Sequence, residues 1–384
     1  MKKILGFIGG AMSFAVIYMA SSSPIPLYTT YRQMLGLSNA DLSISSVLYF
    51  AGTVISLLFF ARLSNYLGRR PVILSTLVLS SVGCLMFLSL NSAALFLVAR
   101  FVQGLSCGLG SGCIAAYIVD IASGKKATIA TSSAPMIGLA LGSFGSGALA
   151  QYGYQGTIYL VVLVILAISG ILVLFGEETV QAKKGAATSL CPQISAPGSV
   201  RKLLPAASAV FVGTWAIGGF YQAFSAPMAA EQLGTTNLMV AAAVFACLQA
   251  PNIIGSTLAG KMETDKAQKL GMAVFLISIM AVIFSLSRGT VAAFLISSGF
   301  AGASWGLAYA GSMRGIMVQT QAADRAGVLS TIYIISYSGA AIPNLIVGKV
   351  SAYFDLFQIA VGYGILVLVT CIITFHFTKG NVRT

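Results

Sequence analysis

Long apolar runs, separated by short polar segments, are the feature that most restricts how this chain can fold. The segments 72–90 and 158–176 contain no charged residue, and a helix of about 20 apolar residues crosses the hydrocarbon core of a bilayer. Charged residues make up only 8% of the chain and hydrophobic residues 57%, so a water-soluble fold would lack polar surface. We therefore expect the chain to fold inside a membrane.

Runs of this kind occur twelve times and predict an all-α membrane protein. The first run follows two lysines and ends in small residues, as a secretory signal does, but its removal would leave an odd number of spans, so we read it as a membrane helix. The polar connector 177–203 predicts two pseudo-symmetric six-helix bundles, 1–176 and 204–384. The expected spans are 4–23, 42–60, 71–90, 93–119, 127–150, 157–176, 204–226, 237–259, 270–287, 290–312, 326–348 and 353–376.

The basic residues test this arrangement, because inner loops of membrane proteins are rich in Lys and Arg. With both termini in the cytoplasm, all but four of the 22 basic residues lie on the inner side. The exceptions are Arg32, Arg288 and Lys349 outside and Arg100 within a span. Topology thus explains the positive charge, and we expect no nucleic-acid partner. With one histidine, His376, and no paired cysteine spacing, neither a metal nor a cofactor is expected.

The two halves repeat each other in sequence. Leu35-Gly36-x-x-Asn39 recurs 198 residues later as Leu233-Gly234-x-x-Asn237, and Gly104-x-Ser-x-Gly108 recurs at the same offset as Gly302-x-Ser-x-Gly306. G-x-S-x-G also occurs in hydrolases, where the serine sits on a strand-to-helix turn. Both copies here lie within apolar helices without a nearby histidine, so we interpret them as small residues that let helices approach closely.

The loop after the second span carries a more specific pattern, Arg62-Leu-Ser-Asn65-Tyr-Leu-Gly68-Arg69-Arg70. It resembles the signature of the major facilitator superfamily, Gly-x-Leu-Ala-Asp-Arg-x-Gly-Arg-Arg/Lys, with Ala61, the residue before Arg62, in place of the first Gly and Asn65 in place of the usual Asp. The resemblance implies a gate in which Asn65, Gly68, Arg69 and Arg70 act together with Asp120 on the fourth span. The alternative is that the two arginines only fix the topology.

The fourth span contains Arg100-x-x-Gln103-Gly104, which resembles a second signature of the same family. A charge in hydrocarbon costs about 2.5–3.5 kcal/mol on insertion scales, so Arg100 should face the bundle interior. No acidic residue lies mid-span, and its partner must be water, a backbone carbonyl, Gln103 or the substrate. We expect Arg100 and Gln103 to contact the substrate or to serve as scaffold.

The fifth span carries Gly138, Gly142 and Gly147 after Pro135. This resembles the glycine-rich signature of the exporters in the superfamily, although Ser143 and Ser146 replace its Pro and one Gly. The resemblance implies that the three glycines belong to the gating machinery. The alternative is close packing of this span against the eighth or tenth span.

Further polar and aromatic side chains within or beside the spans are candidates for a central cavity. An amide side chain that faces lipid is costly, so the Asn and Gln residues are the stronger candidates for the cavity. Trp and Tyr are weaker candidates, because they also collect at membrane interfaces. The candidates are Tyr28, Tyr31, Trp215, Gln222, Gln249, Asn252, Trp305, Tyr337 and Asn344.

The resemblance implies a secondary transporter of the twelve-helix drug and small-molecule exporter branch. We expect export of an amphipathic or drug-like molecule by a monomer in a bacterial inner membrane; the alternative is import or exchange of a small metabolite, including an anion, through Arg100. A membrane-embedded enzyme lacks clustered catalytic groups in this sequence. Because the nine acids lie at span ends or in loops, the usual proton carrier is absent, and Asp41 is the remaining candidate proton site.

Overall fold

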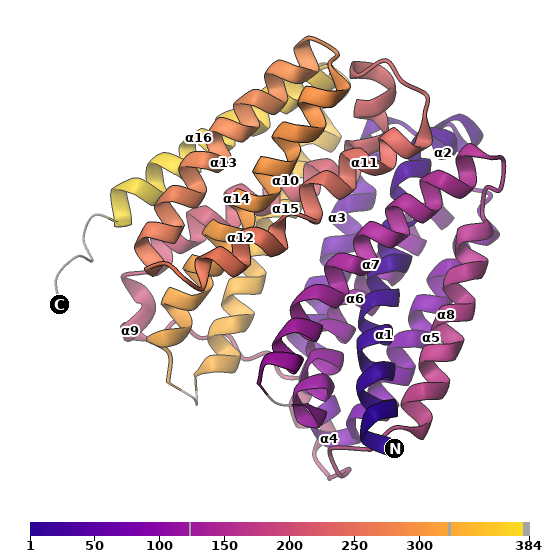
Figure 1. Ribbon diagram of the computed structural model, residues 1–384, viewed down its shortest axis with the longest axis vertical. Helices are drawn as coiled ribbons and strands as arrows, with labels where there is room; N and C mark the ends of the chain where they lie inside the picture. Colours follow the sequence, from indigo (N-terminus) through magenta and orange to yellow (C-terminus); the bar gives the residue numbers. More distant parts are fainter. Residues whose placement is uncertain (123, 322–323, 379–384) are drawn as a thin grey trace. The chain divides into compact units, whose positions relative to one another are not determined.

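The computed structural model describes residues 1–122, 124–321 and 324–378, and within them the chain is all helical (Figure 1). Twelve helical segments in this part of the chain are long and apolar enough to cross a membrane, which confirms the predicted fold class. Residues 379–384 of the predicted second bundle lie outside the described residues. The spans are Lys2–Leu35, Asn39–Phe60, Arg69–Leu88, Ala93–Ile121, Ile129–Gln151, Thr157–Phe175, Leu204–Gln232, Leu238–Ala259, Thr264–Ser287, Val291–Val318, Gly327–Val350 and Leu356–Thr378.

The chain divides into two compact units. Unit 1 comprises Met1–Leu37 and Leu48–Pro192, and unit 2 comprises Ser38–Val47 and Gln193–Thr384. The boundary in the second half of the chain therefore lies within the polar connector. Residues Ser38–Val47, which include the first nine residues of the second span, by contrast group with unit 2.

Unit 1 is built around α1 (Lys2–Ser22). This helix packs against α6 (Ala93–Ile121), α7 (Lys125–Gln151) and α8 (Thr157–Phe175), and Figure 1 shows α1, α6 and α7 side by side. The remaining helices of the unit are α2 (Tyr28–Leu35), the second half of α3 (Asn39–Ile55), α4 (Ser64–Leu67) and α5 (Arg69–Leu88). Helix α5 packs on α6 and α8, so α1, α5, α6 and α8 form a packed group of four.

Unit 2 repeats this arrangement around α10 (Leu204–Pro227). Helix α10 packs against α14 (Val291–Val318), α15 (Arg325–Val350) and α16 (Leu356–Thr378), and α13 (Thr264–Ser287) packs on α14 and α16. The group α10, α13, α14 and α16 is thus the counterpart of α1, α5, α6 and α8. The other helices of unit 2 are α9 (Gly198–Arg201), α11 (Leu238–Gln249) and α12 (Asn252–Ala259).

Glycines allow the closest helix contacts in both units, as the repeated motif predicts. A Cβ added at Gly104 would lie 2.0 Å from the Tyr49 carbonyl oxygen, and one added at Gly302 would lie 2.0 Å from that of Leu248. One turn later, a Cβ at Gly306 would lie 2.1 Å from the Asn252 carbonyl oxygen. The same backbone contact at the same place in each half supports a duplicated six-helix unit.

Several predicted boundaries are wrong. The first span continues beyond Ser22 through a 3₁₀ turn at Ile25–Leu27 into α2, and the ninth begins at Thr264 rather than at residue 270. The reason is that helix hydrogen bonding continues into polar first and last turns, which hydropathy does not register. The eighth span is interrupted at Pro251, which separates α11 from α12, because proline cannot donate the helical hydrogen bond.

The fifth span packs closely on the first span. Cβ atoms added at Gly138 and Gly142 of α7 would lie 2.0 Å and 2.2 Å from the carbonyl oxygens of Ala15 and Met19. These glycines therefore pack on α1, and the packing of this span against the eighth or tenth span stays a prediction. Gly147 is also buried. Small residues identify a close helix contact, but the sequence does not identify its partner.

We predict that Gly104→Leu lowers the thermal stability of the purified protein, because the new side chain meets the Tyr49 carbonyl and must push α3 away from α6. The expected loss is about 1–3 kcal/mol, the usual cost of overpacking a core. The matched control is Gly362→Ala in α16, where an added Cβ meets nothing within 4 Å and alanine favours the helix. An unchanged unfolding midpoint for Gly104→Leu, measured by scanning fluorimetry, would contradict this close contact.

Candidate functional site

Arg100 lies in the core of unit 1 with its side chain fully buried. Its Nη1 donates to the Ser21 carbonyl at 2.8 Å and to Gln103 Oε1 at 2.7 Å. Gln103 in turn donates through Nε2 to the Ala20 carbonyl at 2.8 Å. The guanidinium lies 4.7 Å from the ring centroid of Tyr49, within the range of a cation–π contact.

This arrangement holds a cation in the bundle without a carboxylate partner. Within the part of the chain that the structure describes, Arg100 Nε and Nη2 have no hydrogen-bond partner. A buried donor without a partner costs about 1–3 kcal/mol, and more when it is charged. The Nε and Nη2 edge of the guanidinium could therefore donate to a carboxylate, a phosphate or a carbonyl oxygen of a bound molecule.

Tyr28 and Tyr31 form an aromatic layer of unit 1 next to Arg100. Tyr31 shares a 2.8 Å hydrogen bond with the Tyr159 hydroxyl, and Tyr28 makes an edge contact with Phe96, with ring centroids 5.4 Å apart. The Arg100 guanidinium lies 6.0 Å from the Tyr28 ring centroid. Tyr28 therefore flanks the cation, whereas Tyr31 is held in the aromatic core.

In unit 2 the structure brings three of the predicted aromatic residues together. Trp215 lies with its ring centroid 4.6 Å from that of Tyr337 and 5.7 Å from that of Trp305. Tyr309 adjoins this group at 6.3 Å from Trp215. A Cβ at Gly218 would lie 2.6 Å from the Trp305 ring, so this glycine makes room for the indole. The cluster offers a polarisable surface with polar ring edges.

Two of the predicted amides lie in a buried network of unit 2. Asn344 is fully buried; its Nδ2 donates to Ser46 Oγ at 3.4 Å, and its Oδ1 accepts from the Tyr363 hydroxyl at 3.0 Å. Gln222 joins through a 3.5 Å contact between its Oε1 and Ser46. Ser43 donates to the Asn344 carbonyl at 2.6 Å. Residues 38–47 thus complete the hydrogen bonding of these amides.

The other two amides, Gln249 and Asn252, flank the proline that separates α11 from α12. Both are half-buried, and Asn252 Oδ1 accepts from Ser256 Oγ at 3.2 Å. No hydrogen bond between described residues joins them to the Asn344 network. The predicted cavity residues of unit 2 therefore form three separate sets: the aromatic cluster, the Asn344 network and the two amides beside the proline.

Arg69, the first residue of α5, organises the predicted gate. Its Nε donates to Asp120 Oδ2 at 2.9 Å, and its Nη1 donates to Ser64 Oγ and Asn65 Oδ1, both at 2.7 Å. Asn65 thus accepts a hydrogen bond where the family signature has a carboxylate. The Arg70 side chain does not take part in this group of hydrogen bonds; its Nη2 donates to the Leu174 carbonyl.

Glu178 is a member of this group that the sequence does not indicate. Its Oε1 and Oε2 accept from the backbone N–H groups of Arg69 and Arg70, each at 2.9 Å. Gly68 precedes α5 with φ +95° and offers no side-chain cap, so Glu178 caps the helix from more than a hundred residues away. A Cβ at Gly68 would lie 2.9 Å from Glu178 Oε2, which explains the glycine. Asp120 also accepts from Thr179 Oγ1 at 3.0 Å.

Asp41 has a local role. Its Oδ2 accepts from the Ser38 backbone N–H at 2.8 Å and from the Ser38 hydroxyl at 2.7 Å, while the Asp41 N–H donates back to Ser38 Oγ at 3.2 Å. This is the reciprocal arrangement of a capping box at the start of α3. The structure therefore gives Asp41 a capping function, and its use as a proton site stays a prediction.

Comparison with known proteins places these groups in a family context. The chain matches the family model described as Major Facilitator Superfamily over residues 10–344. Three relatives are "Multidrug resistance protein MdtL" of Klebsiella pneumoniae (33% identity over 28% of this chain and 28% of the relative), "Multidrug resistance protein MdtM" of Salmonella typhimurium (30% over 37% and 36%) and "Uridine/deoxyuridine transporter" of Lactococcus lactis (22% over 41% and 34%). The chain thus aligns with between 28% and 36% of the length of these relatives.

We predict that Glu178→Gln lowers the stability of the purified protein by about 0.5–2 kcal/mol, the usual range for the loss of a helix cap. The negative charge of Glu178 also interacts favourably with the positive, N-terminal end of the α5 dipole, and this interaction is lost in the variant. Glu177→Gln is the matched control, because Glu177 contributes its backbone carbonyl, which accepts from the Tyr117 hydroxyl at 2.8 Å, and no side-chain hydrogen bond among the described residues. Equal thermal midpoints for the two variants would argue against capping by Glu178.

Proposed function

The chain belongs to the Major Facilitator Superfamily, and from this premise we propose that it exports an amphipathic or drug-like molecule by alternating access. The observation that carries the proposal is the likeness to the MdtL and MdtM multidrug resistance proteins. In this proposal the protein works as a monomer in a bacterial inner membrane, with both termini in the cytoplasm, and catalyses no reaction.

Two features support an amphipathic substrate. The Trp215, Trp305 and Tyr337 cluster provides aromatic faces with few hydrogen-bonding groups, which suits flat apolar molecules. The guanidinium edge of Arg100 and the Gln103 amide provide a polar contact in unit 1. We assign substrate contact to these five residues, and treat Tyr28 as a wall of the Arg100 site.

The alternative is import or exchange of a small metabolite. The likeness to the uridine/deoxyuridine transporter supports it, as do the Arg100 donors without a partner. A nucleoside would use its carbonyl oxygens, and an anionic metabolite its carboxylate or phosphate, as the acceptor for Arg100.

A thermal-shift screen of the purified protein against cationic drugs, nucleosides and organic acids separates these proposals, because a ligand that binds the folded state raises its stability. We predict stabilisation by amphipathic drugs, and loss of about tenfold or more in affinity in Arg100→Ala for any ligand that carries an acceptor for the guanidinium. Arg100→Lys should not restore it, because Lys lacks the planar fork. Wild-type affinity in Arg100→Ala for every ligand found would make Arg100 a scaffold residue.

We further propose that Arg69, Asn65, Gly68, Arg70 and Asp120 act as a gate, supported by the 2.9 Å pair of Arg69 with Asp120. An ion pair at the protein surface contributes little to the free energy of unfolding. The role of this pair would therefore be to shift the equilibrium between the inward-facing and outward-facing conformations. Asp120→Asn should therefore slow transport more than it weakens ligand binding. Equal losses in both, or none, would count against a gating role. The role of Gly138, Gly142 and Gly147 in gating stays a proposal beside their packing on α1.

Energy coupling is the last element of the proposal. All nine acidic residues lie at helix ends or in loops, away from the span centres where proton carriers act in transporters. We expect proton exchange to be weak or absent, leaving facilitated diffusion, substrate exchange or another ion. Proteoliposomes loaded with a pH dye test this: substrate-dependent proton flux that persists in Asp41→Asn would overturn the expectation, whereas flux that vanishes in that variant would make Asp41 the carrier.

A further inference from the structure

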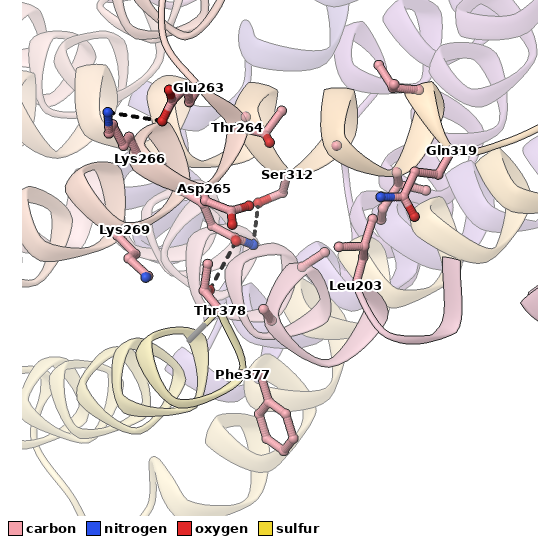
Figure 2. Close-up of a pocket in the computed structure, with 17 residues that line it drawn as sticks. Leu203, Glu263, Thr264, Asp265, Lys266, Lys269, Ser312, Gln319, Phe377 and Thr378 are labelled. Carbon is pink, nitrogen blue, oxygen red and sulfur yellow. Dashed lines mark hydrogen bonds and ion pairs between the residues drawn. The ribbon is translucent and has the colours of Figure 1, made fainter. Parts of the chain in front are cut away.

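A pocket of about 770 Å³ opens in unit 2 where α13 begins (Figure 2). We call it the α13 pocket; it is lined by the starts of α10 and α13 and the ends of α14 and α16. None of the transport proposals uses it. Its lining combines apolar side chains, including Leu203, Ile316 and Phe377, with charged and amide groups.

The floor of the pocket is polar and fixed. Gln268 is 7% exposed; its Nε2 donates to Ser312 Oγ at 3.0 Å, and its Oε1 accepts from Thr378 Oγ1 at 3.2 Å. Figure 2 shows this chain of hydrogen bonds across the floor. The amide thus joins three helices, and the pocket has a preformed polar end beside apolar walls, as small-molecule sites have.

In unit 1 the segment after α8 packs at the place that corresponds to this pocket. The helices α1, α5, α6 and α8 pack in the same pairs as α10, α13, α14 and α16. There the segment after α8 contacts two of these helices: the Glu177 carbonyl accepts from the Tyr117 hydroxyl of α6, and Glu178 accepts from the first two N–H groups of α5. The segment that follows α16 in unit 2 lies outside the described residues. In unit 1, therefore, an acidic segment meets the basic start of a helix.

The charge at the start of the helix differs in unit 2. Helix α5 begins with Arg69 and Arg70, whereas the first turn of α13 carries one acidic residue, Asp265, and one basic residue, Lys266. An acidic segment like that around Glu178 would be repelled by Asp265. The molecule that complements this pocket is therefore expected to carry a positive charge.

The other charges around the pocket leave Asp265 available. Lys266 pairs with Glu263 at 3.0 Å on the exposed rim, and Arg314, outside the lining, donates to the Met262 carbonyl. Lys269 lies one turn after Asp265, and Figure 2 shows its side chain turned away from the Asp265 carboxylate. Within the described residues, the Asp265 carboxylate makes no hydrogen bond or ion pair with a neighbour.

We propose that the α13 pocket binds an amphipathic amine, with its ammonium group at Asp265 and its apolar part against Leu203, Ile316 and Phe377. A charge-assisted contact of this kind is stronger than a neutral one. The same chemistry is offered by a soluble organic amine and by the headgroup of an aminophospholipid. The lining contains none of the residues of the Arg100 and Trp215 groups, so this inference does not depend on the proposed transport.

Photolabelling of the protein in nanodiscs tests the proposal. The probe is an alkyl trimethylammonium with a diazirine in its chain, and the reference is an alkyl sulfate with the same chain. We expect the ammonium probe, but not the sulfate, to label peptides from the start of α13 and the end of α16. Mapping the label by mass spectrometry separates this pocket from any other binding site.

Three variants complete the test. Asp265→Asn should raise the concentration for half-maximal labelling about tenfold or more, as expected for a lost contact to a charged group. Gly315→Leu should also block labelling by filling the pocket, since an added Cβ there finds its nearest atom at 3.6 Å and causes no clash. Asp355→Asn makes the same charge change outside the lining and should leave labelling unchanged.

The results decide both the site and its occupant. Equal labelling by the two probes, or full labelling of folded Asp265→Asn, would overturn the proposal. Loss of labelling when phosphatidylethanolamine replaces phosphatidylcholine in the nanodisc would identify the headgroup of an aminophospholipid as the occupant. Labelling that this lipid leaves unchanged, but that a soluble alkylamine displaces, would identify a soluble amine.

Discussion

The close approach of helix backbones at glycine is the contact on which the rest of this structure depends. In a bilayer the hydrophobic effect does not drive helices together, and association relies on packing between small residues. Gly104 against Tyr49 in unit 1 and Gly302 against Leu248 in unit 2 provide this contact in equivalent places. Arg100 lies one turn before the first glycine, and Trp305 lies between Gly302 and Gly306, so the same contacts position the candidate polar and aromatic sites.

The burial of Arg100 follows from that packing. A charged side chain in hydrocarbon is tolerated when it faces a bundle and finds polar groups, and here the Ser21 carbonyl, the Gln103 amide and the Tyr49 ring surround it. None of these groups neutralises the charge. The side chain is thus held in place by weak acceptors, which a stronger acceptor on a bound molecule could supplement without rebuilding the core.

Much of the fold could be predicted from the sequence, because hydropathy, loop charge and the repeated glycines each report a physical requirement of the bilayer. The Arg69 and Asp120 pair could be expected from the family signature. Glu178 could not, since a carboxylate that caps α5 from the connector leaves no periodic pattern in the sequence. Nor could the partner of Gly138, because a small residue indicates a close contact without naming the neighbour.

The same limit applies to the candidate cavity residues. The sequence indicates that Asn344 and Gln222 should avoid lipid, and the structure shows that Ser46 and Tyr363 complete their hydrogen bonds. The bundle boundaries 1–176 and 204–384 and the roles of the site residues remain predictions. The sequence does not show which way each side chain points, because this depends on the rotational orientation of each helix relative to its neighbours.

The central claim is alternating access, and solute counterflow tests it most directly. Proteoliposomes are loaded with an unlabelled ligand found in the thermal-shift screen, diluted into a trace of the same ligand carrying a radiolabel, and sampled over time. A carrier that exposes one site to each side in turn predicts transient accumulation of label above equilibrium, abolished in protein-free liposomes. Binding of the ligand with only monotonic equilibration, or with no uptake, would contradict the account.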